Sequence, residues 1–275
     1  MTAVKLGCIC GSFNRSFDAG AMDQMGFLRH CATVLRVQGI ELQDIHFPQT
    51  RPAYLQALRR AAADLGLAIA GIGVHNDFGR AATTWRQSEI AKVKQWIEVA
   101  EQLGAPQVRV FAGHPEGRTA ERWPLMIAAL REVAAVAAQA GLRLGLENHN
   151  HGAFTRTAAD QLRVLEEVGH PALCHLLDTG NYVDGWPSVE RTVDRAVHVH
   201  AKFWTVAPDG AEPSIDYPKL IQRLRRRHYE GWISFEYEAA EAEATGIPRA
   251  LGYLRQLVES SAFPPGGRTT APGGS

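Results

Sequence analysis

Four side chains that could bind a divalent metal follow four short apolar segments in the second half of the chain. The segments cover residues 142–146, 172–177, 196–199 and 232–235, and the residues that close them are Glu147, Asp178, His200 and Glu236. Two glutamates, one aspartate and one imidazole suit a divalent ion of borderline-hard character. Each residue alone has an ordinary structural alternative, such as a turn, a helix cap or a salt bridge. Four such coincidences in succession favour the metal site.

The spacing of the segments predicts how these four side chains meet. Each apolar run has the length of a buried strand, and a helix-length segment follows each of the first three runs. Strands joined by helical crossovers are parallel, so their last residues gather at one end of the sheet.

The first half of the chain shows the same alternation, which predicts a (β/α)8 TIM barrel. Its expected strands are 6–10, 40–45, 67–74 and 108–111, and the expected helices of the whole chain are 22–38, 52–65, 90–103, 123–140, 158–168, 187–195, 217–227 and 248–260. An open doubly wound sheet is the alternative. No glycine-rich dinucleotide motif follows the first strand, and candidate functional residues end strands three to eight, so the barrel is favoured. We predict one barrel domain at residues 1–260 and a disordered tail at 261–275, which is rich in Pro, Gly, Ser and Thr.

Composition narrows the classes of partner. Lysine plus arginine equal aspartate plus glutamate at 29 each, so the net charge is zero and no global field attracts nucleic acid or an anionic membrane. The four cysteines lack zinc-like spacing and no apolar run is long enough to span a bilayer. We predict a cytoplasmic enzyme with a small-molecule substrate and with neither nucleic acid nor membrane as partner. Assembly into a homo-oligomer is left open.

Other side chains are predicted to surround the same end of the barrel. Lys202 lies two residues after His200 and therefore shares its inward direction, which makes it a candidate to hold a substrate oxygen. Further candidates for substrate binding end other strands or follow them closely: His75, His114, His149, Asn181 and Trp204. Glu41 and Arg109 should share one polar cluster inside the barrel, with a structural role, because a buried charge must be paired. His175 should face outward and be structural.

The motifs around these residues resemble the sugar phosphate isomerase/epimerase family, also called xylose isomerase-like barrels. The resemblance covers about residues 4–258, and its most specific part is the order and spacing of the four acid and imidazole residues. The motifs that carry it are Val-Arg-Val-Phe-Ala-Gly at 108–113, Leu-Glu-Asn-His at 146–149, Leu-Asp-Thr-Gly-Asn at 177–181, His-Ala-Lys at 200–202 and Ser-Phe-Glu-Tyr-Glu at 234–238. The resemblance implies one divalent ion, Mn, Mg, Co or Zn, bound by Glu147, Asp178, His200 and Glu236. It also implies that Lys202 contacts the substrate.

The chain departs from the family pattern at one position that matters. Many members carry a histidine three residues after the aspartate of strand six, where this chain has Asn181. The DNA-repair branch also carries an Asp-x-His motif after strand seven, and residues 203–207 contain no such motif. A trinuclear endonuclease site of the AP-site type is therefore disfavoured.

These observations predict a divalent-metal-dependent isomerase or epimerase of a sugar or related hydroxy-ketone. The reaction would pass through an enediolate whose charge the metal stabilises, with Glu147 and Glu236 as the catalytic residues that remove and return the proton. A lyase or dehydratase acting on a keto-sugar or keto-cyclitol is the alternative, because the same enediolate can expel a β-substituent. A non-catalytic barrel is a further alternative that the intact acids make less attractive. Glu238 is the reserve ligand should strand eight extend further.

Overall fold

A computed structural model describes residues 4–150 and 152–260, and these form a closed eight-stranded parallel barrel. The strands neighbour one another in sequence order, and β8 pairs with β1 to close the barrel. The strands are β1 Lys5–Ile9, β2 Gly39–Gln43, β3 Ala68–Gly73, β4 Gln107–Val110, β5 Arg143–Glu147, β6 Leu173–Asp178, β7 Ala196–Phe203 and β8 Trp232–Tyr237. The predicted fold class is confirmed. The predicted tail, 261–275, lies outside the described residues.

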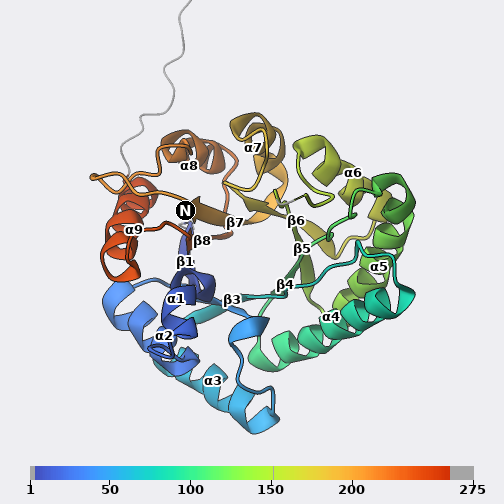
Figure 1. Cartoon of the computed structure of the whole chain (residues 1–275). Coiled ribbons are helices and arrows are strands. Elements are labelled where there is room, and N and C mark those ends of the chain that lie inside the picture. The colour runs from blue at the N-terminus through green and yellow to red at the C-terminus, as the bar shows by residue number, and fades with distance from the viewer. Residues whose placement is uncertain (1–3, 151, 261–275) are drawn as a thin grey trace, which may run out of the picture.

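Helices form an outer ring around the strands, as Figure 1 shows. They are α1 Asn14–Asp18, α2 Gln24–His30, α3 Pro52–Asp64, α4 Thr83–Leu103, α5 Thr119–Gln139, α6 Ala158–Val168, α7 Trp186–Thr192, α8 Tyr217–Arg226 and α9 Glu243–Glu259. Local sequence sets several ends of these helices. Thr157 and Asp160 form a reciprocal capping box at the start of α6, and Gly104 ends α4 with a φ of 73°. None of the helices within the described residues is long and apolar enough to cross a membrane.

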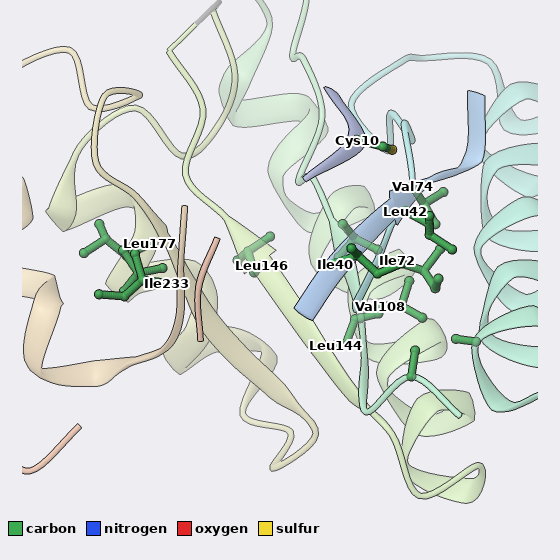
Figure 2. Packing of buried hydrophobic residues seen from close by; sticks show 14 of the residues in the cluster. Cys10, Ile40, Leu42, Ile72, Val74, Val108, Leu144, Leu146, Leu177 and Ile233 are labelled. Carbon is green, nitrogen blue, oxygen red and sulfur yellow. The ribbon is translucent and has the colours of Figure 1, made fainter. Parts of the chain in front are cut away.

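The strands divide their side chains between two environments. Apolar residues such as Ile40, Val108 and Leu146 face the helix layer, where they pack with other buried side chains (Figure 2). The alternate residues face the interior and are mostly polar: Glu41, Gln43, Gln107, Arg109, Glu147, Asp178, His198, His200, Lys202, Ser234 and Glu236. All of these are buried, so they must satisfy one another.

Several predicted boundaries are wrong by a few residues. β7 continues to Phe203 and β8 to Tyr237, because Lys202 pairs with Glu236 and Phe203 with Tyr237 in an extended ladder. The apolar run of β7 stops at His200, but its alternation continues with Phe203 facing the helix layer. Helices α5 and α9 begin four or more residues before their predicted starts, and each tolerates an internal proline.

His175 on β6 faces the helix layer, as predicted. Its Nδ1 lies 2.9 Å from the Nε2 of Gln161 on α6, whose amide also donates to the carbonyl of Leu146 at 2.8 Å. The ring is only 2% exposed, and burial lowers the pKa of His175 to about 3.

This depressed pKa predicts a pH effect on stability. In the unfolded chain the imidazole of His175 is protonated near pH 6.5, whereas in the folded chain it stays neutral until about pH 3. The stability that neutral His175 contributes is therefore present above pH 6.5 and is lost as the pH falls towards 3. Between pH 7 and 5.5 we expect this group to cost about 1 kcal/mol of unfolding free energy. Urea unfolding of the wild type and His175→Gln at both pH values measures it. Equal losses in the two proteins would contradict the assignment.

Candidate metal centre

The four residues predicted as ligands meet at one end of the barrel. Glu147, Asp178, His200 and Glu236 come from four successive strands, and each offers one ligand atom within 4.8 Å of the others. All four are buried, with exposed fractions between 0 and 7%. Glu147 and Asp178 are the last residues of β5 and β6, whereas His200 and Glu236 lie inside the longer β7 and β8.

The atoms that face this centre fit a cation. In each of the four residues one buried atom has no hydrogen-bond partner among the described residues: Glu147 Oε2, Asp178 Oδ2, His200 Nδ1 and Glu236 Oε2. The three carboxylate oxygens have only the charged nitrogens of Arg109 or Lys202 beside them, and a cation bound among the four residues would satisfy these oxygens and Nδ1 of His200 together. Three carboxylates and one imidazole are ligands that Mg²⁺, Mn²⁺, Co²⁺ and Zn²⁺ accept. The residues therefore fit the expected divalent ion.

Two cationic side chains border the three carboxylates and the imidazole of the candidate centre. The Nε of Arg109 lies 3.1 Å from Glu147 Oε2. The Nζ of Lys202 lies 3.3 Å from Asp178 Oδ2 and 3.2 Å from Glu236 Oε2, and it also pairs with Glu238. Glu238 itself is not among the four clustered ligands. Lys202 therefore lies directly against two of the four candidate ligands.

Burial and charge shift the titration of these groups in opposite directions. Burial raises the pKa of Asp178 well above its usual value, and Lys202 offsets this only in part. Burial would also raise the pKa of Glu147, but Arg109 and then His200 hold it below its usual value. Lys202 loses solvation, yet the carboxylate of Asp178 and its acidic neighbours raise the pKa of Lys202 well above 10.5. Burial is the main cause of the raised pKa of Asp178, and the neighbouring carboxylates of Glu236 and Glu147 add to it; a divalent cation beside these groups would favour the ionised form of Asp178.

Hydrogen bonds to the main chain hold Asp178 and Lys202 in place. Asn148 accepts from the amide of Asp178 at 2.9 Å and donates to its carbonyl at 3.0 Å. The hydroxyl of Thr179 accepts from the amide of Lys202 at 3.0 Å, and Tyr217 donates to the carbonyl of Lys202 at 2.6 Å. The ends of β5, β6 and β7 are thereby cross-linked, which limits movement of the side chains they carry.

Of the predicted substrate-binding residues, Asn181 contacts a candidate ligand and Trp204 packs on Lys202 beside the centre. The amide of Asn181 lies 3.4 Å from Glu147 Oε1 and is 3% exposed. Trp204 donates to the carbonyl of Gly180 at 3.3 Å, and its ring lies 4.8 Å from the ammonium of Lys202. Their placement agrees with the prediction, and their contact with substrate remains a proposal.

The three remaining histidines predicted to bind substrate, His75, His114 and His149, lie away from the four candidate ligands. His75 bonds through Nδ1 to Asp44 at 2.6 Å, and His114 lies 3.9 Å from Asp77. His149 packs its ring on Phe111 at 4.7 Å and on His114 at 5.7 Å. These histidines thus form an outer group on the side of β2 to β5, and their predicted role in substrate binding stays a prediction.

Sequence reasoning missed three contacts of the centre. Glu41 was assigned a structural role, but its Oε2 lies 3.2 Å from Nε2 of His200. Arg109 was expected beside Glu41, and the two are in fact joined through His200 and Glu147, so the single interior cluster is confirmed. Asn148 has the strand parity of a helix-facing residue. Strand parity predicts that Glu41 and His200 both face the interior but does not show that they meet, and nothing in the sequence pattern marks Asn148.

The fold is thus a parallel TIM barrel with a candidate metal centre at the carboxyl ends of its strands. The chain belongs to the family described as xylose isomerase-like TIM barrel, whose model matches residues 35–257.

Named relatives include enzymes of two reaction types. An inosose dehydratase of Halalkalibacterium halodurans is 29% identical over 51% of this chain, and the match spans about half of that protein, 54%. An L-ribulose 3-epimerase of Mesorhizobium japonicum is 27% identical over 88% of this chain and 86% of the relative. The structure of a D-psicose 3-epimerase with D-tagatose from Clostridium cellulolyticum H10 superposes with a TM-score of 0.77 at 16% identity, over 94% of this chain and 100% of that one. The last similarity supports the fold alone.

Proposed function

We propose that the chain is a divalent-metal-dependent epimerase or isomerase of a sugar or related hydroxy-ketone. The observation that carries this proposal is the meeting of four ligand atoms from successive strands within 4.8 Å of one another, beside a buried lysine. The similarity to an L-ribulose 3-epimerase, over 88% of this chain and 86% of that protein, supports the same reaction class. The family alone would be compatible with several reactions.

The ion that we propose is Mn²⁺. Mn²⁺ and Mg²⁺ prefer ligand sets that are rich in carboxylates, as this one is, whereas structural zinc sites typically contain thiolates. When bound, the ion would supply Lewis-acid stabilisation of the negative charge that develops on substrate oxygens.

The residues of the chain can perform the remaining steps. Glu147 and Glu236 stand on β5 and β8, with β6 and β7 between them, so their carboxylates approach a substrate from two sides. One glutamate, as the carboxylate, takes the proton from the carbon next to the carbonyl, and the other, which must begin as the carboxylic acid, gives its proton to the opposite face. The two glutamates end with exchanged protonation states, and proton exchange with water restores the starting state. The ammonium of Lys202 donates hydrogen bonds to a substrate oxygen and helps to hold its charge. Proton removal on one face and return on the other inverts the carbon, which is epimerisation.

A dehydratase is the second candidate, because of the similarity to inosose dehydratases over half of the chain. Like the epimerase, a dehydratase would begin with proton removal by one glutamate. The β-hydroxyl of the substrate would then be protonated and leave as water.

Solvent isotope exchange separates these functions. Manganese-loaded protein is incubated in heavy water with a panel of ketopentoses and ketohexoses that includes L-ribulose, and the recovered sugars are analysed by mass spectrometry and NMR. We expect deuterium at the carbon next to the carbonyl, together with the epimer, and none after treatment with EDTA. A product lighter by one water would support the dehydratase. No exchange and no product across the panel would contradict the proposal for this substrate class.

A further inference from the structure

A second polar cluster lies inside the barrel directly behind His200. Glu41 of β2 is fully buried, and its two carboxylate oxygens accept from different histidines of β7. Oε1 lies 2.5 Å from Nε2 of His198, and Oε2 lies 3.2 Å from Nε2 of His200. Glu41 therefore joins the metal centre to the deeper interior.

Hydrogen-bond chemistry assigns the protons of this cluster. The amide Nε2 of Gln107 can only donate, and it lies 2.7 Å from Nδ1 of His198. Nδ1 of His198 is then an acceptor, so its Nε2 carries the proton that goes to Glu41. Since an ionised carboxylate only accepts, Nε2 of His200 also donates to Glu41. The other nitrogen of His200, Nδ1, faces Oε1 of Glu147 at 3.6 Å and Oε2 of Glu236 at 3.5 Å, so Nδ1 is the nitrogen that a cation between these carboxylates would reach.

Two glycines, Gly7 on β1 and Gly71 on β3, leave space for the side chains of this cluster. A Cβ on Gly71 would lie 3.3 Å from Oε2 of Glu41 and 3.2 Å from Cγ of Gln107, and one on Gly7 would lie 3.2 Å from Oγ of Ser234. These glycines leave room for polar side chains where a larger residue would press on them. The hydroxyl of Ser234 lies 3.0 Å from Nε2 of His198, and completes the surroundings of that histidine.

A second metal site is the obvious alternative. Glu41, His198 and His200 do offer three ligand-type atoms within 4.8 Å of one another. A metal there would have to displace the protons that the histidine nitrogens share with Glu41, and the amide donated by Gln107 to Nδ1 of His198 holds the proton of that ring on Nε2. The geometry favours a role of Glu41 through His200.

We propose that Glu41, itself held by His198, is a positioning residue that fixes the ring orientation and tautomer of His200 so that Nδ1 binds the metal. The inference rests on the proposed metal site and goes beyond it, because it assigns a role to residues that do not touch the ion. A carboxylate behind a ligand histidine raises the basicity of the imidazole and prevents ring rotation. Loss of such a partner typically weakens metal binding about 10- to 100-fold.

Metal affinity of matched variants tests this role. Glu41→Gln keeps the shape but removes the charge, and Ser234→Ala removes a contact of His198 without touching His200. Mn²⁺ dissociation constants are measured by competition with a chelating indicator, and folding is checked by circular dichroism. We expect Glu41→Gln to bind about 10- to 100-fold more weakly than wild type, and Ser234→Ala to stay within about twofold, because its hydroxyl does not reach His200. Wild-type affinity in Glu41→Gln, or an equal loss in both variants, would overturn the inference. Failure of the wild type itself to bind would instead overturn the metal site.

If Glu41→Gln does not fold, a measurement on the wild-type protein tests the proposed tautomer of His200. Long-range 1H–15N spectra of 15N-histidine-labelled, zinc-loaded wild type report which nitrogen of His200 carries the proton. We expect the proton on Nε2 and coordination through Nδ1. Coordination through Nε2 would overturn the inference.

Discussion

Replacing Glu147 or Glu236 by glutamine should abolish most activity even when the metal site is full. Each substitution preserves size and one carbonyl oxygen but removes a proton acceptor, so we expect kcat to fall about a hundredfold or more. Asp178→Asn should differ, because Asp178 lies on β6, between the strands β5 and β8 that carry the two glutamates, and its carboxylate is 3.3 Å from the Nζ of Lys202. In that variant metal affinity should fall first, and excess Mn²⁺ should restore part of the activity.

The comparison needs metal content and kcat measured on the same samples. Glu132→Gln is a suitable control, because this glutamate is exposed on α5 and pairs with Lys94 at 2.7 Å. Its kcat should equal that of the wild type. Equal rescue of Glu147→Gln, Glu236→Gln and Asp178→Asn by excess metal would refute proton transfer by the glutamates, while the metal site would stand.

Replacing Arg109 by methionine should cost the metal-free protein about 3–5 kcal/mol of unfolding free energy. The Arg109 and Glu147 side chains are both 3% exposed and 3.1 Å apart, so the change leaves a buried carboxylate without its main counter-charge. The guanidinium also stacks 4.3 Å from the ring centre of Phe111, and this contact is lost as well. A bound divalent cation would neutralise the same carboxylate, so the loss should be smaller with Mn²⁺ present.

Arg163→Met provides the matched control for this prediction. Arg163 also pairs with a glutamate, at 2.7 Å, and stacks 4.1 Å from the ring of Trp123, but its side chain is 61% exposed. Exposed pairs contribute about 1 kcal/mol or less. Denaturant unfolding with and without Mn²⁺ measures both variants. A loss below about 1 kcal/mol in metal-free Arg109→Met would contradict the importance of this buried pair.

The barrel and the meeting of the four candidate ligands could be predicted because both depend on simple periodicities. Parallel strands that are buried on both sides read as short apolar runs, and crossover helices separate them. Glu147 and Asp178 end such runs, so their placement follows from strand direction alone. His200 and Glu236 were predicted at the correct place although their strands are longer, because inward parity does not depend on where the strand ends.

Contacts between distant strands could not be predicted in the same way. Arg109 is two strands from Glu41 and one from Glu147, and only the barrel's closure and strand stagger decide which acid it reaches. The pairing of Glu41 with His200 joins β2 to β7 across the interior. Alternation shows that both face inward but gives no height along the barrel axis. The hydrogen bonds of Asn148 depend on the local path of the chain after β5, which periodicity does not describe.

The most direct test of the account is the position of a bound metal. Crystals of protein loaded with Co²⁺ can be measured at wavelengths on both sides of the cobalt absorption edge, so that the anomalous signal identifies the element. We expect one anomalous peak per chain, bounded by the carboxylates of Glu147, Asp178 and Glu236 and by Nδ1 of His200. The absence of a peak, or a peak at Glu41 and His198 instead, would contradict the metal centre on which the proposed function depends.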